Sequence, residues 1–430
     1  MSFPLSIPSP LAAALAGRPR VLLALSGGVD SAVALAVLQH AGCAVTAVTF
    51  KNFCYGETAD PAGRACCSLE AVDEARRLAA RLGADHHVSD VSEAFRSRVI
   101  EPFVSEYATG RTPNPCVECN AAVRFPQLLR LARLGGHDLI ATGHYARTLG
   151  TSAGAGATAG APALLRGLDP DKDQSYFLYR LAPELLRRTV FPLGWFTKGE
   201  VRAAARALQL PMADKPESQE ICFVPDGDRS FLFPDPVVHV PGEIVDGRGR
   251  VLGRHRGLVH YTVGQRRGLG VAAPRPLYVL ELDPEGNRLV VGSREDLART
   301  RIVCDAVVGT GSALAGSGPP APWSGSAAEE RAAGEGEVLA RIRHGQRGLP
   351  VGGWRWCDGT LVVELAEPAH GVAPGQALVL HTAREGRILG GGRIVAADGG
   401  PAEQEAAPAG IARTEGRANP GRSREVDNDA

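Results

Sequence analysis

The sequence lacks long apolar runs, and no stretch approaches the roughly 20 residues that a membrane-spanning helix needs. The segment Met1 to Arg20 has no cationic start of the kind that opens a secretory signal peptide. Nine cysteines in 430 residues are too few for a disulfide scaffold. These absences predict a cytoplasmic protein that has no membrane partner.

An excess of either charge is also missing, because 47 basic and 47 acidic residues cancel. Any contact with a nucleic acid must therefore come from local patches. One candidate patch is basic, interleaved with glycines and Tyr261, and contains Arg248, Arg250, Arg254, His255, Arg256, Gln265, Arg266 and Arg267. Exposed arginines are most often just solvated, but in a module of short turns this pattern favours phosphate contact.

Two common phosphate-binding motifs are absent from the most informative stretch, Ser26 to Ser31. No Gly-Lys-Ser/Thr follows, which excludes a Walker A loop, and no Gly-x-Gly-x-x-Gly fingerprint is present. What is there is an apolar strand pattern (Val21 to Leu25), a Gly-Gly turn and an apolar helix pattern (Asp30 to Leu38). This geometry points backbone N–H groups at an anion, and we interpret it as a phosphate site rather than an ordinary turn.

The first half of the chain alternates short apolar strands with amphipathic helices, which predicts an α/β fold with a doubly wound parallel sheet. In such sheets ligands bind at the carboxyl ends of strands, where the Gly-Gly turn lies. The expected strands are Val21–Leu25, Ala44–Phe50, Asp85–Val88 and Asp138–Thr142. The expected helices are 69–82, Ser92–Tyr107, Phe125–Leu134 and Lys198–Leu208.

The pattern changes after Pro225, where β-like runs separated by Pro-Gly, Asp-Gly and Glu-Gly-Asn turns replace helical periodicity. We therefore expect a catalytic domain, a small β-rich central domain, a C-terminal β-barrel and a disordered polar tail. Their predicted bounds are 18–224, 225–298, 299–395 and 396–430. Low-complexity insertions are expected at 151–163 and 312–336.

Three cysteines lie in polar, proline-flanked loops, namely Cys116, Cys119 and Cys222. Pro113 and Pro115 predict a stiff, non-helical presentation of the first two. Free cysteine is often only a small buried hydrophobe, an interpretation that fits Cys43, Cys304 and Cys357 better. A Cys-x-x-Cys in an α/β enzyme points to redox, metal or sulfur chemistry. The pattern does not decide the roles of Cys54, Cys66 and Cys67.

The joint order of several motifs between Arg20 and Val395 resembles the tRNA-specific 2-thiouridylase family of the PP-loop ATP pyrophosphatase superfamily. The motifs, in chain order, are SGGVDS, TPNPCVECN, ATGHY, DKDQSYFLY, SQEICF, HYTVGQRRGLG and PGQALVL. The resemblance implies a sulfurtransferase that uses ATP with Mg²⁺ to thiolate the wobble uridine (position 34) of tRNA. The uridine C2 oxygen would be adenylated, pyrophosphate released, and AMP later displaced by sulfur.

The resemblance also implies roles for individual residues. ATP would be held by Ala24, Leu25, Ser26, Gly27, Gly28, Val29, Asp30, Ser31, Phe50 and Gly143. Cys222 would carry the incoming sulfur as a persulfide, and Cys119 would release the product, leaving a Cys119–Cys222 disulfide. tRNA would contact Asn114, Pro115, Cys116, Lys172, Asp173, Gln174, Arg343 and His344. The implied partners are the tRNA anticodon stem-loop and a persulfide donor, either a sulfur-relay protein or a cysteine desulfurase. Without tRNA the protein would be a monomer.

The chain departs from the family at Cys116, where many members have Asp. Three thiolates, from Cys116, Cys119 and Cys222, can hold a 4Fe–4S cluster with one iron left open for sulfide. Zinc would want a fourth ligand, and none is obvious nearby in the sequence. A persulfide relay, an iron–sulfur site and structural zinc therefore remain alternatives. Rival functions are a different PP-loop ligase and a tRNA-binding protein that has lost catalysis.

Overall fold

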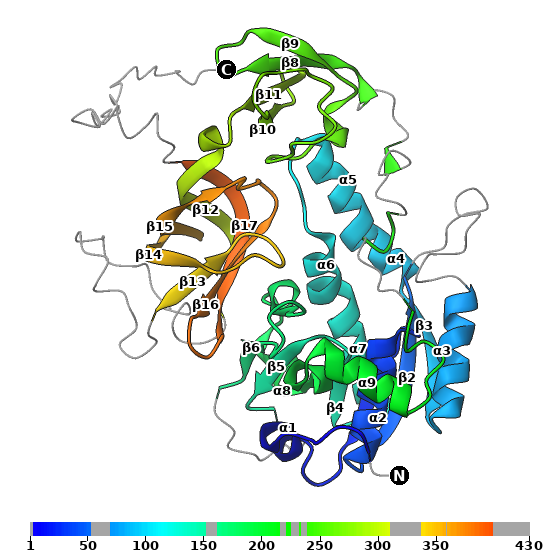
Figure 1. Ribbon diagram of the computed structural model, residues 1–430. Helices are drawn as coiled ribbons and strands as arrows, with labels where there is room; N and C mark the ends of the chain where they lie inside the picture. The colour runs from blue at the N-terminus through cyan, green and yellow to red at the C-terminus, as the bar shows by residue number, and fades with distance from the viewer. Residues whose placement is uncertain are drawn as a thin grey trace, which may run out of the picture.

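The computed structural model describes residues 3–52, 69–151, 161–215, 221–224, 232–233, 239–309, 337–357 and 359–398. The predicted insertion 312–336, most of the insertion 151–163 and the three cysteines Cys54, Cys66 and Cys67 lie outside these ranges. Three parts follow one another along the chain (Figure 1): an α/β domain, a small antiparallel-rich sheet and a β-barrel.

The α/β domain is built on a parallel sheet whose strands have the order β3-β2-β1-β4-β7. The strands are β1 (Arg20–Ala24), β2 (Ala44–Lys51), β3 (Asp85–Asp90), β4 (Leu139–Thr142) and β7 (Thr189–Val190). Side chains of β1 alternate between two cores, with Val21 and Leu23 on one face of the sheet and Leu22 on the other. Because both faces are covered, the predicted doubly wound sheet is confirmed.

Helices of the α/β domain fall into two groups by the core that they join. The group that packs with Val21 is α1 (Ser9–Ala14), α2 (Val29–His40), α3 (Leu69–Arg81) and α9 (Lys198–Ala207). The group that packs with Leu22 is α4 (Ser92–Phe95), α5 (Glu101–Ala108), α6 (Pro115–Glu118), α7 (Phe125–Leu134) and α8 (Pro183–Arg187). π-helical turns at Arg96–Ile100 and Cys119–Arg124 join α4 to α5 and α6 to α7. A hairpin of β5 (Ala146–Leu149) and β6 (Ala163–Arg166) completes the domain.

The predicted non-helical presentation of Cys116 and Cys119 is wrong, because both cysteines lie in helical turns. Pro115 occupies the first helical position, where its missing N–H costs nothing. The Asn114 side chain caps the helix by accepting the Val117 N–H at 3.4 Å. The Pro-Asn-Pro run is therefore a helix start signal and not a barrier to helix formation.

The central part is a four-stranded sheet in the order β10-β11-β8-β9. Its strands are β8 (Gly242–Asp246), β9 (Val251–His255), β10 (Tyr278–Asp283) and β11 (Arg288–Gly292). The expected basic patch is only partly present, because His255 and Tyr261 are buried against each other in its core. His255 lies within hydrogen-bonding distance of the Asn287 carbonyl at 3.1 Å, so its ring has a structural role. The patch that remains exposed comprises Arg248, Arg250, Arg254, Arg256, Arg266 and Arg267.

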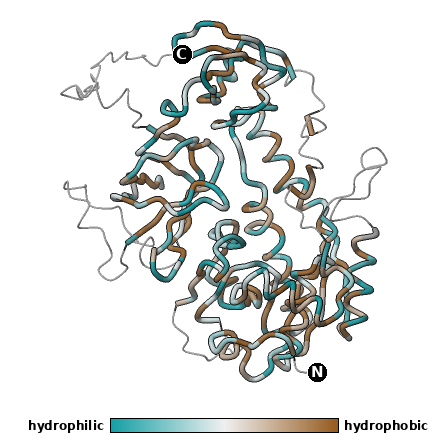
Figure 2. The backbone as a smooth tube through the Cα atoms, viewed as in Figure 1, coloured by the Kyte–Doolittle hydropathy of each residue, from teal (hydrophilic) through white to brown (hydrophobic). Residues whose placement is uncertain are grey.

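The C-terminal part is a closed barrel in the order β12-β15-β14-β13-β16-β17. Its strands are β12 (Ala298–Gly309), β13 (Val338–Arg341), β14 (Leu349–Cys357), β15 (Thr360–His370), β16 (Ala377–Thr382) and β17 (Ile388–Asp398). Buried apolar residues of these strands, among them Ile302, Leu361, Leu378 and Ile394, form the interior core of the barrel. Figure 2 shows hydrophobic and hydrophilic residues along the same strands. Asp398 pairs with Arg301 of the neighbouring strand β12. Residues 396–398 therefore belong to β17 and not to the predicted tail.

The barrel is fastened to the α/β domain close to the cysteine helix. Thr112 donates its N–H to the Pro374 carbonyl at 2.7 Å, and Gln376 donates to the Thr112 carbonyl at 2.8 Å. Tyr176 donates its hydroxyl to the Ala377 carbonyl at 2.9 Å. The segment that leads into α6 is therefore held from the barrel side. Within the described ranges, no helix is long and apolar enough to cross a membrane.

Candidate active site

The Gly-Gly turn between β1 and α2 is closed by Ser31. The Ser31 hydroxyl accepts the Ser26 N–H at 3.2 Å and donates to the Gly28 carbonyl at 3.1 Å. Gly27 has φ of 77°, a left-handed conformation that favours glycine. The turn places the start of α2 directly after the carboxyl end of β1, which is the ligand-binding edge of a parallel sheet.

A cavity of about 240 Å³, here called the nucleotide cavity, opens beside this turn. Seven of the ten predicted ATP residues line it: Ala24, Leu25, Ser26, Asp30, Ser31, Phe50 and Gly143. Gly27, Gly28 and Val29 are not among its lining residues, and Val29 is buried under the turn. Sequence reasoning did not single out Thr49, Asn52, Arg124 or His144, which also line it.

Gly143 lets the loop after β4 approach the start of α2. A Cβ at this position would lie 3.0 Å from the Ser31 nitrogen and 3.1 Å from the Asp30 carbonyl carbon. Both neighbours are backbone atoms, which cannot rotate away. The glycine therefore sets the separation of two walls of the nucleotide cavity.

Asp30 lies at the centre of a small charge cluster. Lys198, at the first position of α9, places its ammonium nitrogen 2.7 and 2.8 Å from the two carboxylate oxygens of Asp30. Tyr145 donates its hydroxyl to the same carboxylate at 2.8 Å. The Lys198 side chain is only 9% exposed. Lys198 was not among the residues predicted for the site, because a pairing across 168 residues leaves no local signal in the sequence.

A second and larger cavity, here called the thiol cavity, has a volume of about 530 Å³. Cys116, Cys119 and Cys222 all line it. It shares Asp30, Arg124, His144, Gln174 and Cys222 with the nucleotide cavity. The two cavities therefore adjoin, and a group bound at the Gly-Gly turn lies next to the thiols.

The three thiols differ in exposure but share one nearby cation. Cys119 is buried, whereas Cys116 and Cys222 are exposed at the cavity wall. The enclosing walls raise the pKa of the Cys116 thiol to about 11, and the neighbouring Cys119 contributes in the same direction. Burial also raises the pKa of Cys119. The Arg124 guanidinium opposes both shifts and thus favours the thiolates.

The π-helical turn explains how Arg124 reaches the thiols. Its hydrogen bonds run from residue i to i+5, so a residue five positions after Cys119 returns towards the same face. His144 also lies beside Arg124. Burial, with a smaller contribution from Arg124, lowers the pKa of His144 to about 3. The ring is therefore neutral near pH 7, and its Nδ1 lies 2.7 Å from the Thr142 hydroxyl.

The residues predicted to contact tRNA do not all lie in one place. Pro115, Cys116, Lys172, Gln174 and His344 line the thiol cavity. The His344 ring packs on Phe177 with 4.5 Å between centroids, which brings the barrel to the cavity rim. Arg343 is exposed on the same barrel loop and donates to the Gly371 carbonyl.

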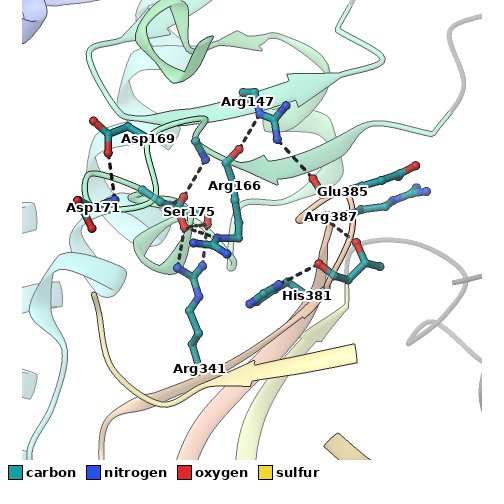
Figure 3. A network of polar contacts seen from close by, with 12 residues as sticks. Arg147, Arg166, Asp169, Asp171, Ser175, Arg341, His381, Glu385 and Arg387 are labelled. Carbon is teal, nitrogen blue, oxygen red and sulfur yellow. Dashed lines mark hydrogen bonds and ion pairs between the residues drawn. The ribbon is translucent and has the colours of Figure 1, made fainter. Parts of the chain in front are cut away.

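Asp173 and Asn114 take structural positions. The Asp173 carboxylate is buried and accepts bonds from the backbone of Gly167 and Ser175 and from Arg166 and Arg341. Figure 3 shows Arg341 reaching from the barrel towards Ser175 and Arg166 of the α/β domain. Asn114 is the cap of α6. Both side chains are therefore engaged within the protein.

A metal site would need several His, Cys, Asp or Glu side chains close together. In the part of the chain that the structure describes, no three His, Cys, Asp or Glu side chains are gathered as a metal site. Cys116, Cys119 and Cys222 share a cavity without forming such a set, so the iron–sulfur and zinc alternatives gain no support. Asp30 is the carboxylate of the nucleotide cavity, which suits the one or two carboxylates that Mg²⁺ takes alongside phosphates.

Comparison with known families matches all three parts of the chain. Residues 19–226 match the family described as tRNA methyl transferase HUP domain. Residues 234–293 match its PRC-barrel domain, and residues 321–394 match the aminomethyltransferase beta-barrel domain. Each match falls on one of the parts described above.

Individual relatives carry a more specific name, tRNA-specific 2-thiouridylase MnmA. The protein of Nitrobacter winogradskyi is 44% identical over 405 residues, covering 92% of this chain and 96% of that one. The chain belongs to the tRNA-specific 2-thiouridylase family. Family members from Rhodospirillum centenum and Methylobacterium radiotolerans are 43% and 44% identical. They cover 91% and 87% of this chain, and 95% and 93% of their own lengths. The 2-thiouridylase resemblance noted in the sequence is thereby confirmed.

Proposed function

We propose that this protein is an ATP-dependent sulfurtransferase that converts the wobble uridine of tRNA to 2-thiouridine. The observation that supports this most directly is the junction of the two cavities. A turn built for phosphate binding lies beside a chamber lined by three thiols, with Asp30, Arg124 and Cys222 on the shared wall. Activation by ATP and attack by sulfur can then occur on one bound base.

In the first half-reaction the uridine C2 oxygen attacks the α-phosphate of ATP, and pyrophosphate leaves. Backbone N–H groups at the start of α2 and the hydroxyls of Ser26 and Ser31 hold the phosphates. Asp30 would hold Mg²⁺, whose chemistry here is to neutralise charge on the departing pyrophosphate. Lys198 holds the Asp30 carboxylate in position through contacts to both of its oxygens.

In the second half-reaction the Cys222 persulfide attacks C2, and the C2–O bond to AMP breaks. Cys119 then attacks Cys222 Sγ, which releases the 2-thiouridine and leaves a Cys119–Cys222 disulfide. Arg124 supports this step because a nearby cation favours the thiolate form of Cys119. The exposed position of Cys222 suits sulfur delivery by a partner protein, either a sulfur-relay protein or a cysteine desulfurase.

The tRNA would enter from the side of the thiol cavity where the α/β domain and the barrel meet. Lys172, Gln174 and His344 lie on that rim. Recognition of a single loop base requires that the base be turned out of its stack. The exposed arginines of the central sheet, such as Arg254 and Arg266, supply phosphate contacts at a distance from the base.

The assignment predicts separate effects on the two half-reactions. Cys119→Ala and Cys222→Ala should abolish wobble 2-thiouridine, because each removes a sulfur that the transfer needs. Both variants should retain tRNA-dependent ATP–pyrophosphate exchange, because adenylation uses neither thiol. Thiolation is read as a mobility shift in mercury-containing gels, with Cys43→Ala as the control for loss of an unrelated buried cysteine.

Other outcomes of these assays identify the rival functions. Exchange that is indifferent to tRNA would indicate a PP-loop ligase acting on a small molecule, and absence of exchange would indicate a tRNA-binding protein. Undiminished thiolation in either cysteine variant would overturn the assignment. The iron content of protein purified without oxygen tests the cluster directly. If iron-free protein thiolates tRNA from a persulfide donor, the reaction does not need an iron–sulfur cluster.

A further inference from the structure

The proposed sulfur transfer uses two thiols, yet three line the thiol cavity. We propose that Cys116 is a resolving thiol, which attacks the Cys119–Cys222 disulfide left by each turnover. The attack forms a Cys116–Cys119 disulfide and returns Cys222 to the thiol form. This inference rests on the proposed function and adds to it the step that prepares Cys222 for its next sulfur.

The position of the two cysteines on the helix favours this exchange. Cys116 and Cys119 are three residues apart in continuous helical turns, so their side chains lie on one face. Helical neighbours at this spacing have Cβ atoms about 5–6 Å apart, and a disulfide needs about 3.5–4.5 Å. Cys116 lies in the first turn of α6, where its N–H makes no bond along the helix, so a small contraction there disturbs fewer hydrogen bonds than one in a helix interior.

The pKa shifts of Cys116 and Cys119 show that these thiols and Arg124 influence one another. Besides burial, the charge of Cys119 raises the pKa of the Cys116 thiol, which agrees with their three-residue spacing on the helix. Arg124 acts on both thiols in the opposite direction. An attacking thiolate at Cys116 therefore forms beside a cation and next to the sulfur that it attacks.

The step balances as a simple thiol–disulfide exchange. Cys116 loses its proton, and its thiolate attacks the Cys119 sulfur. The Cys119–Cys222 bond breaks, and the electron pair leaves on Cys222 Sγ, which takes up a proton. No net oxidation occurs in this step. The two oxidising equivalents now reside in the Cys116–Cys119 disulfide, which an external dithiol reductant removes.

Exposure explains what the exchange achieves. Cys222 is exposed and must be a thiol before a partner can load it with sulfur. Cys119 is buried, so a disulfide between Cys119 and Cys222 would block loading for as long as it persists. Transfer of the disulfide to the pair on the helix frees Cys222 at once. The new disulfide keeps one exposed sulfur, that of Cys116, which a reductant can attack while Cys222 is being loaded.

A single turnover without reductant tests the proposal. The enzyme is loaded with persulfide on Cys222, mixed with tRNA and ATP, quenched in acid and alkylated, and its disulfides are mapped by peptide mass spectrometry. The unaltered enzyme should show mainly Cys116–Cys119, and Cys116→Ser should trap Cys119–Cys222. Cys116→Ala provides a second variant without a hydroxyl, and Cys43→Ala should behave as the unaltered enzyme.

The pH dependence provides an independent readout. Because the pKa of Cys116 lies near 11, its thiolate fraction rises about tenfold per pH unit below that value. The rate at which Cys119–Cys222 converts to Cys116–Cys119 should follow it between pH 7 and 10. Formation of 2-thiouridine with a Cys119–Cys222 disulfide that persists at every pH would overturn the proposal. Absence of 2-thiouridine in the unaltered enzyme would instead overturn the proposed function.

Discussion

Lys198, at the start of α9, is the cation that pairs with Asp30 beside the Gly-Gly turn. A buried lysine is rare unless an acid pairs with it, and both Asp30 oxygens lie within 2.8 Å of its nitrogen. The Thr197 and Glu200 capping box fixes the start of α9, and with it the position of Lys198. A segment far from the turn in the sequence therefore sets the orientation of the Asp30 carboxylate.

Replacement of this cation should impair the first half-reaction. Lys198→Met preserves much of the buried stem but leaves Asp30 with the Tyr145 hydroxyl as its remaining described partner in this cluster. We expect tRNA-dependent ATP–pyrophosphate exchange to fall at least about tenfold, equivalent to about 1.4 kcal/mol. Lys215→Met is the matched control, because Lys215 pairs with Glu74 on the surface. Equal exchange rates in the two variants would contradict a role for Lys198 at the turn.

At the scale of secondary-structure elements, the site depends on three connections at the carboxyl edge of the sheet. The β1–α2 turn presents the groups that we propose bind phosphate, and the loop after β4 packs against it through Gly143. The helical run α6, π-turn and α7 then sets Cys116, Cys119 and Arg124 on the opposite wall. The two turns at β1 and β4 are short, so a change of backbone in either displaces a wall of the cavity.

Gly143→Ala should disturb this edge without touching a catalytic side chain. The new methyl group would meet backbone atoms at 3.0 and 3.1 Å, so α2 or the β4 loop must move. Such overpacking costs about 1–3 kcal/mol, and we expect a higher KM for ATP and a lower Tm. Gly247→Ala, in the turn after β8, serves as the control, because a Cβ at that position would have no neighbouring atom within 4 Å. An unchanged KM for ATP in Gly143→Ala would show that this contact does not shape the nucleotide cavity.

At the scale of the whole molecule, a buried ion pair joins the barrel to the α/β domain. Arg341 of β13 donates to Asp173 at 2.6 Å and to the Ser175 hydroxyl at 2.8 Å, and its side chain is 2% exposed. Although burial acts in the opposite direction, Arg341 and hydrogen bonds from Gly167 and Ser175 keep the pKa of Asp173 below its ordinary value. The stability from this pairing is complete above about pH 5, where the unfolded Asp is ionised as well, and is lost as the pH falls through the lowered pKa.

Arg341→Ala should loosen the barrel from the catalytic domain. It leaves a buried carboxylate with one cation fewer, a change that costs about 3–5 kcal/mol in comparable pairs. We expect a lower midpoint of urea unfolding and separation of the barrel transition from that of the α/β domain. Arg347→Ala, an exposed residue on the neighbouring loop, is the control. Restoration of part of the loss by a second change, Asp173→Asn, would identify the unpaired charge as the cause, and its failure would contradict that explanation.

Much of the fold could be predicted because its signals are local. The strands and helices of the α/β domain follow from apolar runs and periodicity, and α7 spans the predicted residues Phe125–Leu134. The seven predicted residues that line the nucleotide cavity lie in short motifs beside strand ends, where the topology of the sheet brings them together. The conformation of the segment with Cys116 and Cys119 was predicted wrongly, because its prolines are compatible with two different structures. Pro115 can interrupt a helix or begin one, and here the Asn114 cap decided for a helix.

By itself the sequence determined which chemical groups are present and in which motifs, because composition and local spacing need no folding to be read. It determined a phosphate-binding turn, three thiols in two segments and alternation typical of a parallel sheet. Only the tertiary structure decided that Cys222 lines one cavity with Cys116 and Cys119, that Lys198 pairs with Asp30 and that Asp173 lies at the barrel interface. These contacts join residues far apart along the chain, and burial and charge pairing are properties of the folded molecule alone.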